Sequence, residues 1–547
     1  MWVIQSELAN ESTDMATVKT VSDLRSLQIP NVDGYCMILL GYYSPGDIGA
    51  ATSVYWSASS TANDNGGSVF SPVSSPASGR WIVHYDGVVN VRCFGAVGDG
   101  SADDTVAIES AMAIGLRTYF PAVTGLTSGY RVTRTITAPR IDIIGDGANF
   151  GGSSKTSTIW AREVVGPLFG QLTSGACISG ISIDWRNGTS GLSETATGLW
   201  DRTTSSDIVT HVRCEDTQLL NLATSGAKAF DATNCSIVSI KNVSFSAITN
   251  GYGFFGKGNS TIISMDNPHF NYTLECITID SSITSQLNVR GGDFGNSTIA
   301  LALRNVVGTF SGTYFEGMGH PIYAGDVALS TNGLGVGDIA GAVDSPFNVR
   351  HGSLEFSACD FYQNTSEKPA FWYVGKQSPF GLAGEVTVSG GRISFNGCIG
   401  GAYGFSTRML ADMSTENRGG FRVDVNDPGQ FLGIWNSDPI ETTERSSGVV
   451  RTYLDARAVT SGSIYLLFGS PTGSYSNRFV VIENGHFVYG CGAESDAYSS
   501  PPNVAPYGGT NKSGDIVNMS RASIAEGGPR AQYCSVDGTP GTWVAIG

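Results

Sequence analysis

The sequence is poor in charge, and the charge that it carries is mostly acidic. Only 15% of its 547 residues are charged, and 48 acidic residues face 32 basic ones, for a formal net charge of −16. This balance argues against a nucleic-acid partner, because contacts with phosphates need a basic face. No run approaches the ~20 apolar residues of a membrane span, so we expect no membrane insertion. An acidic glycan remains possible, because a local arginine patch can override the field of the whole chain.

Motifs of metal-binding and disulfide-bonded proteins are also missing. The ten cysteines form no CxxC pair, and the six histidines show no metal-ligand spacing. Several cysteines, such as Cys177, Cys235 and Cys276, fall in apolar strand-like runs, so we interpret them as small buried side chains. Residues 1–20 lack the basic start and the apolar core of a secretion signal. We therefore expect no cofactor, no metal and assembly in a reducing cytoplasm.

Glycine and short apolar runs are what the sequence has in abundance. It contains 71 glycines, and turn-forming Gly, Asn and Asp separate the apolar runs. Aromatic residues make up 10% of the chain, which is too many for a disordered protein. One ordinary core does not accommodate 547 residues, whereas a solenoid does. These features predict an all-β protein.

One segment after residue 88 has a more specific pattern. FGAVGDGSADDTVAI at 94–108 combines a short strand, a glycine-rich turn and the start of a helix. The helix is expected at about 104–114, with Asp103 or Asp104 as its N-cap. The turn lacks the Lys-Ser/Thr of a phosphate-binding loop, so we interpret it as a connection to the helix.

Other motifs surround this segment and together they indicate a family. They are GYYSPGDIG at 41–49, YWSASSTANDNGG at 55–67, GRW at 79–81, YFPA at 119–122, YRV at 130–132 and IIGDG at 143–147. In combination they resemble the start of pectate-lyase-like right-handed parallel β-helices in bacteriophage tailspikes. The resemblance implies an N-terminal capping module over 1–88, a homotrimer, and attachment to the phage tail or baseplate through the N-terminal region. It also implies a virion component that meets a bacterial surface polysaccharide.

Phenylalanines repeat along the chain with the period of a solenoid. Strand-like triplets contain Phe245, Phe270, Phe294, Phe315 and Phe361, at spacings of 25, 24, 21 and 46 residues. A β-helix coil takes roughly 20–25 residues, so the last interval holds about one inserted coil. Because side chains alternate along a strand, inward phenylalanines would stack into a ladder and their sequence neighbours would face outward. We expect the β-helix to span 89–420.

The composition changes near residue 420. Runs such as 421–425 and 464–468 alternate in hydrophobicity, which predicts antiparallel strands of a β-sandwich over 421–510. A small β module is expected at 511–547. It resembles a C-terminal module of tailspikes from phages of encapsulated Gram-negative bacteria, and the resemblance implies a role in trimerisation or glycan contact.

The ladder register gathers carboxylates on one outward row. Asp293, Tyr314 and Asp360 each precede a ladder phenylalanine, and Glu316 follows one. With ~4.8 Å between coils and ~6.6 Å for two residues along a strand, the Cα atoms of Glu316 and Asp293 should lie roughly 8 Å apart. Glycoside hydrolysis uses two carboxyl groups roughly 5–9.5 Å apart. We predict Glu316 as the general acid and Asp293 or Asp360 as its partner, with three rival carboxylates at Glu275, Asp280 and Glu355.

The same row offers side chains for substrate binding. His269 and Arg392 are expected to extend it, and Tyr314 and Tyr362 would supply stacking surfaces for sugar rings. The insertion at about 317–353 would form loops that wall the cleft. Outward carboxylates on a solenoid also serve solubility alone, and that interpretation stays open for each of them.

Three functions remain after these observations. The leading hypothesis is an endo-acting glycoside hydrolase of a capsular or O-antigen polysaccharide. A polysaccharide lyase needs a uronic acid, a base and charge stabilisation, and we find no outward Arg/Lys row beside an Asp cluster. An adhesin that binds glycan without cutting it has the same fold, because function resides in the site.

Overall fold

The structure is a computed structural model that describes most of the first 360 residues and separate strands beyond them. The described residues are 16–125, 128–150, 155–186, 191–324, 327–337, 347–349, 352–362, 370–374, 391–396, 399–400, 406–411, 422–426, 440–443, 451–454, 463–469, 475–483, 486–491, 516–518, 531–536 and 542–546. The chain divides into two compact units, 1–190 with 216–218 and 191–215 with 219–547. We describe each unit by itself.

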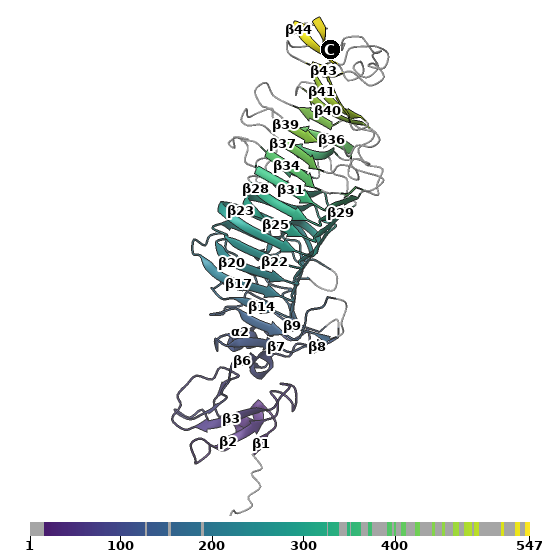
Figure 1. Ribbon diagram of the computed structural model, residues 1–547. Helices are drawn as coiled ribbons and strands as arrows, with labels where there is room; N and C mark the ends of the chain where they lie inside the picture. Colours follow the sequence, from purple (N-terminus) through teal and green to yellow (C-terminus); the bar gives the residue numbers. More distant parts are fainter. Residues whose placement is uncertain are drawn as a thin grey trace, which may run out of the picture. The chain divides into compact units, whose positions relative to one another are not determined.

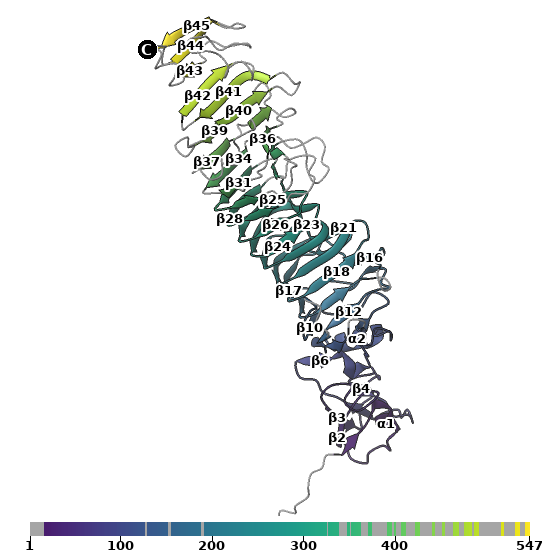
Figure 2. The same cartoon turned by 90° about the vertical axis from the view of Figure 1, so that its right-hand side faces the viewer.

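The first unit begins with a small sheet in the order β1-β2-β3-β5-β4 (Figure 2). The strands of the unit are β1 (Thr17–Val18), β2 (Cys36–Leu39), β3 (Thr52–Ser57), β4 (Val69–Phe70), β5 (Arg80–Ile82), β6 (Val88–Asn90), β7 (Arg117–Phe120), β8 (Val123–Thr124), β9 (Tyr130–Arg131), β10 (Asp142–Gly145), β11 (Lys155–Thr156), β12 (Thr158–Trp160), β13 (Gly166–Pro167), β14 (Cys177–Ser179) and β15 (Ser182–Asp184). The alternating pattern of β3 turns Trp56 inward, where its ring meets that of Trp81 at 5.4 Å between centroids. The short helix α1 (Val21–Ser26) precedes β2, and its cap residue Thr20 accepts a hydrogen bond from the Asp23 N–H.

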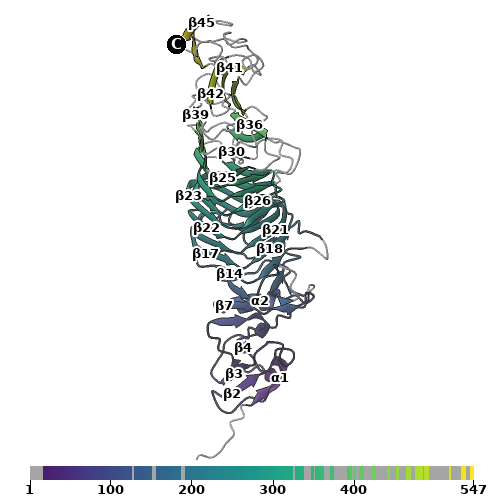
Figure 3. The ribbon, with the colours of Figure 1, turned by 45° about the vertical axis from the view of Figure 1, so that its right-hand side comes forward.

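The expected cap helix is present as α2 (Thr105–Met112), somewhat shorter than the predicted 104–114. A 3₁₀ helix, η1 (Val91–Phe94), precedes it. The apolar face of α2 buries Ile108, Ala111 and Met112 as the spacing predicts. Figure 3 shows α2 next to β7, and the two elements are in contact.

The two aspartates before α2 divide the capping role between them. Asp104 holds the N-cap position, but its carboxylate turns back and accepts hydrogen bonds from the N–H groups of Val97 and Gly98, at 2.7 and 3.0 Å. Asp103 instead accepts from the Thr105 N–H at 3.1 Å. Burial raises the pKa of Asp104 to about 6, against the lowering effect of these two N–H groups. Asp104 therefore fastens the glycine turn, and Asp103 satisfies the helix terminus.

Most of the strands that follow α2 are parallel, and β8 and β11 form a separate antiparallel pair. β7 pairs with β10, and β10 pairs with β14, so the chain returns to the same face once per coil. β9, β12 and β15 stack in the same way on another face. This arrangement confirms a parallel β-solenoid in the first unit.

The second unit continues with parallel coils, and its strands follow one another in chain order (Figure 1). They are β16 (Ala196–Gly198), β17 (Val209–Glu215), β18 (Gln218–Leu222), β19 (Lys228–Asp231), β20 (Cys235–Lys241), β21 (Ser244–Gly258), β22 (Ile262–Asp266), β23 (His269–Arg290), β24 (Asp293–Gly295), β25 (Ile299–Ser311), β26 (Tyr314–Glu316), β27 (His320–Ala324), β28 (Val327–Asn332), β29 (Gly335–Gly337), β30 (Phe347–Val349), β31 (Gly352–Ser357), β32 (Asp360–Tyr362), β33 (Ala370–Val374), β34 (Gly391–Asn396), β35 (Ile399–Gly400), β36 (Ser406–Ala411), β37 (Arg422–Asn426) and β39 (Arg451–Leu454). β38 (Ile440–Thr443), β40 (Ser463–Gly469), β41 (Tyr475–Glu483) and β42 (His486–Cys491) form a four-stranded sheet, and β43 (Ile516–Asn518), β44 (Ala531–Val536) and β45 (Thr542–Ile546) form a three-stranded one.

The predicted phenylalanine ladder is the core of these coils. Phe245, Phe270, Phe294 and Phe315 are fully buried, and successive ring centroids lie 4.6, 4.8 and 4.8 Å apart. These distances match the spacing of neighbouring strands; the first two ring pairs are stacked and the third, Phe294 with Phe315, is tilted by 46°. The inserted coil is also confirmed, because Val336 stands in register between Phe315 and Phe361.

One boundary of the prediction, the end of the β-helix at 420, needs correction. β37 and β39 still pair in parallel, so the parallel stack reaches Leu454 and passes the expected limit at 420. The run 421–425 therefore does not start an antiparallel sandwich. The segment around 464–468 does form antiparallel pairs, between β40 and β41. Alternation alone cannot separate the two cases, because parallel and antiparallel strands share the period of two.

The cysteines named in the sequence agree with the expectation of small buried side chains. Seven cysteines in the part of the chain that is described are free, and five of them, including Cys177, Cys235 and Cys276, are buried. No helix among the described residues is long and apolar enough to cross a membrane.

Candidate functional site

The expected outward row is present on five stacked strands of the second unit, β23, β24, β26, β29 and β32. In successive coils His269, Asp293, Tyr314 and Gly335 stand in register, and Asp360 follows in the next coil. The buried residues Phe270, Phe294, Phe315 and Val336 next to the first four fix which way the strands face, and the side chain of Phe361 lies outside the described residues. The register prediction for Asp293, Tyr314 and Asp360 is therefore confirmed, and the inserted coil contributes only a glycine.

His269 and Asp293 are in direct contact, which the sequence did not indicate. The Nδ1 atom of His269 meets the Asp293 carboxylate from the neighbouring coil. The two side chains are 37% and 51% exposed, so both remain open to solvent and to a ligand. The contact holds the carboxylate in place and orients the imidazole, and it does not involve the Nε2 atom.

Glu316 has open surroundings along the solenoid axis. Its register partners in the two neighbouring coils are Gly295 and Gly337, neither of which has a side chain. The side chain of Glu316 is exposed. Two residues before it, Tyr314 is 41% exposed. The Tyr314 ring lies against Gly335, where an added Cβ would come within 2.6 Å of ring atom Cδ2. The glycine thus makes room for an aromatic surface beside the carboxylate.

The register distinguishes between the two proposed partners of Glu316. Asp293 lies one coil and two residues away, which corresponds to about 8 Å between Cα atoms. Asp360 lies two coils and two residues away, which corresponds to about 12 Å. Only the first separation falls in the range that glycosidases use. The geometry favours Asp293.

The expected position of Arg392 is wrong. Arg392 belongs to β34 and pairs with Ser353 of β31, whereas Asp360 belongs to β32 and pairs with Ile399 of β35. Arg392 therefore lies on a different face from the row. Tyr362 does stand in register with Gly337, as expected, and its side chain lies outside the described residues. The insertion at 317–353 contributes a coil with strands β27 to β31 rather than loops alone.

The three rival carboxylates have different surroundings. Asp280 forms an ion pair with Arg304. Burial raises the pKa of Glu275, and a hydrogen bond of 2.5 Å from the Thr278 hydroxyl lowers it in part. A raised pKa suits a proton donor, so Glu275 is the strongest rival to Glu316. Glu355 lines a concavity of about 200 Å³ together with Gly308, Ala328, Leu329, Ser330, Ser353 and Leu354.

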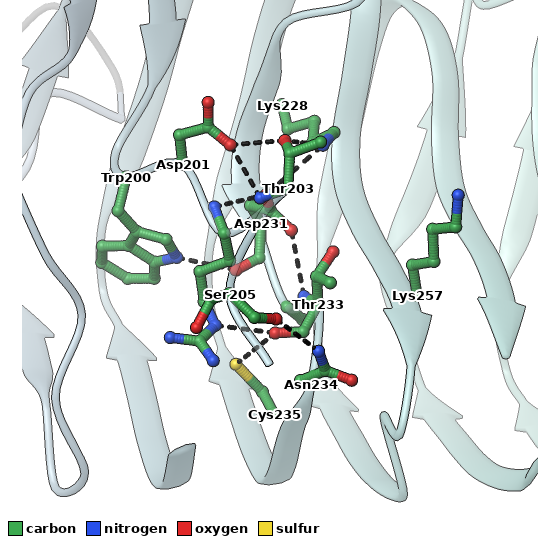
Figure 4. Close-up of polar contacts among 12 residues, drawn as sticks. Trp200, Asp201, Thr203, Ser205, Lys228, Asp231, Thr233, Asn234, Cys235 and Lys257 are labelled. Carbon is green, nitrogen blue, oxygen red and sulfur yellow. Dashed lines mark hydrogen bonds and ion pairs between the residues drawn. The ribbon is translucent and has the colours of Figure 1, made fainter. Parts of the chain in front are cut away.

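A polar cluster beside β19 was also missed by the sequence reasoning. Figure 4 shows Lys228 between Thr203 and Asp231, with Nζ 2.9 Å from the Thr203 hydroxyl and 3.4 Å from the Asp231 carboxylate. Asp231 is fully buried and accepts hydrogen bonds from the N–H groups of Arg202 and Thr233, both at 3.0 Å. These contacts fasten the segment after Trp200 to β19. No motif indicated the cluster, because Thr203 lies 25 residues from Lys228 and Arg202 lies 29 residues from Asp231.

Known proteins are similar to this chain in sequence near its N-terminus and in structure over larger shares. Residues 17–86 match the family model of the phage tail protein small four-stranded beta-sheet domain. No curated protein matches the sequence. The tailspike gp42 of Acinetobacter phage vb_AbaP_AS12 is similar in structure, with 13% identity, a TM-score of 0.46 and coverage of 98% of this chain and 94% of that one.

Two further tailspike structures are similar over smaller shares. Tailspike protein gp49 of Acinetobacter baumannii bacteriophage Fri1, a capsular polysaccharide depolymerase, shows 11% identity, a TM-score of 0.38 and coverage of 85% of this chain and 81% of that one. Tailspike protein 2 of Escherichia coli O157:H7 bacteriophage CAB120 shows 14% identity, a TM-score of 0.41 and coverage of 75% of this chain. The chain spans only about half, 51%, of that protein. At these identities the likeness concerns the fold.

The N-terminal match and the solenoid are two separate findings. The chain carries a phage tail protein domain over residues 17–86 and a parallel β-helix. It therefore has the N-terminal domain and the solenoid that the resemblance to tailspikes implies.

Proposed function

We propose that this tailspike is a depolymerase, an endo-acting glycoside hydrolase that cuts a capsular or O-antigen polysaccharide at the bacterial surface. It acts as a homotrimer that is attached to the tail or baseplate through its N-terminal region. The observation that carries the proposal is the outward row on β24 and β26, where Glu316 stands one coil from Asp293 and next to the exposed ring of Tyr314. Glycoside hydrolysis uses a pair of carboxyl groups, and an aromatic ring beside them can stack on a sugar ring.

The roles follow from the surroundings of each group. Glu316 donates a proton to the glycosidic oxygen as the bond from that oxygen to the anomeric carbon breaks. Asp293, held by His269, either accepts a proton from the attacking water or attacks the anomeric carbon itself. Tyr314 supports the sugar ring. Tyr362 and Arg392 were expected to bind substrate. Arg392 lies on another face of the solenoid, which removes the support for its role.

The proposal is tested on purified surface polysaccharide from the capsulated host. Incubation with the full chain should shorten the polymer and release new reducing ends, one for each bond cut. Ultraviolet absorbance of an unsaturated sugar in the products would show a lyase instead. An unchanged polymer that still binds the protein would show an adhesin.

Two matched variants identify the acid. Glu316→Gln should lower the rate of cutting at least ~10²-fold, and Glu275→Gln should leave the rate unchanged. The reverse result would transfer the role to Glu275, whose pKa burial raises.

A further inference from the structure

Arg162 occupies an unusual position in the first unit. Its guanidinium carbon lies 3.4 Å from the centroid of the Trp160 ring, at the end of β12. Trp160 stands in register with Arg131 of β9 and Asp184 of β15. The stack covers one face of the guanidinium, because a cation is attracted to the face of an indole ring.

The neighbouring arginines have carboxylate partners, and Arg162 has none among the residues that the structure describes. Arg131 pairs with Glu163 at 2.5 Å, and Arg186 pairs with Asp184 at 2.9 Å. No hydrogen bond or ion pair within the described residues reaches the Arg162 side chain, and its Nε atom is buried without a partner. A buried donor without a partner has a free-energy cost that a ligand would remove.

The electrostatic surroundings point the same way. Burial lowers the pKa of Arg162, the carboxylate of Asp184 opposes this, and the guanidinium groups of Arg186 and Arg131 lower it further. The positive charge of Arg162 is thus incompletely compensated, in a chain whose net charge is −16. An anion placed at this point would relieve the repulsion among the three arginines.

We propose that the Arg162 guanidinium, held on Trp160 and flanked by Arg186, binds the carboxylate of an acidic sugar. A planar guanidinium matches the two oxygens of a carboxylate, and stacking on a ring fixes its orientation in advance. The choice of a sugar as the carrier of the carboxylate rests on the proposed function, since a depolymerase meets glycans. The substrate would then be an acidic surface polysaccharide.

The test measures binding rather than cutting, with the full chain and a small probe. Saturation-transfer NMR with sodium glucuronate should show binding that weakens as ionic strength rises, and glucose should bind more weakly. Arg162→Gln should raise the dissociation constant for glucuronate at least ~10-fold, the usual effect of losing a hydrogen bond to a charged group. Arg162→Lys keeps the charge and loses the planar fork, so its dissociation constant for glucuronate should lie between those of the unchanged protein and Arg162→Gln.

The matched control removes an equal charge elsewhere in the same unit. Arg140→Gln leaves Asp142 with its second partner, Arg117, so no carboxylate loses its last ion pair. This variant should bind glucuronate as the unchanged protein does. Absent binding, equal loss in both variants, or acetate that binds as tightly as glucuronate would each overturn the proposal. Because Glu316→Gln should bind glucuronate normally, a failure of the depolymerase assay remains distinguishable from a failure here.

Discussion

Removal of one ladder ring tests the link between the core and the candidate site. Phe294 is fully buried, stacks on Phe270 and makes a tilted ring contact with Phe315, with 4.8 Å between centroids on each side. Phe294→Ala should cost about 3–5 kcal/mol, because the cavity adds to the lost burial. The loss should approach the upper end, since two ring contacts disappear at once and each contributes about 0.5–1.5 kcal/mol.

The loss should remain local, because a solenoid coil contacts only its neighbours. Hydrogen exchange followed by mass spectrometry measures it segment by segment. Amides of β24 and β26 should exchange at least ~10²-fold faster, since every 1.4 kcal/mol corresponds to a tenfold change. Strands of the first unit, such as β12, should keep their protection. Cutting of polysaccharide should also fall, because Asp293 precedes the missing ring in a strand of three residues.

A conservative variant provides the control. Phe294→Leu keeps most of the volume but loses both ring contacts, so it should cost about 1–3 kcal/mol and accelerate exchange less than Phe294→Ala does. Unchanged exchange in Phe294→Ala would contradict a ladder that stabilises these coils. An equal acceleration over the whole chain would contradict the local coupling between coils.

Three further predictions concern charged groups. Glu316→Gln should lower turnover at least ~10²-fold without a change in assembly. Asp360→Asn should keep turnover within about threefold of the unchanged protein, because its Cα lies about 12 Å from that of Glu316. Turnover is measured as new reducing ends, and equal losses in the two variants would refute the pairing of Glu316 with Asp293. The pKa of Asp104 is raised to about 6 in the folded state, so its ionisation opposes folding. The stability contribution of this group is full below pH ~4 and is lost as pH rises towards 6, and Asp104→Asn should flatten this part of the pH profile of the melting temperature. A steeper profile in the variant would reverse the sign. Asp231→Ala removes the carboxylate partner of the half-buried Lys228 and should lower the free energy of unfolding by about 3–5 kcal/mol. The loss should be seen as rapid proteolysis after Trp200. A protease-resistant variant would show that the cluster does not hold this segment in place.

The sequence predicted the features that depend on residues close together in the chain or on a regular spacing between coils. A strand period of two, combined with phenylalanines 21 to 25 residues apart, is sufficient to place Phe294 inward and Asp293 outward. The register between Asp293, Tyr314 and Glu316 followed from the same count, because no insertion separates their coils. The helix after the glycine turn was equally readable, since its start signal and apolar face lie within a few residues.

The position of Arg392 shows where such counting fails. The pair Gly390-Gly391 imitates Gly291-Gly292, but each coil has several strands that begin after similar turns. In the structure Arg392 lies in β34, whose neighbour is β31. A repeat in sequence identifies the period of a solenoid, whereas the face to which a strand belongs depends on the lengths of all the turns before it.

The sequence by itself determined the class of the fold, the ladder and the outward row, because these depend on alternation and period. Only the tertiary structure decided which side chains meet across coils. The contact of His269 with Asp293, the burial of Glu275 and the stack of Arg162 on Trp160 each join side chains to surroundings that the order of residues does not specify. These contacts depend on rotamers, corner geometry and solvent exclusion, which are properties of the packed solenoid and set the charge and reactivity of its outer face.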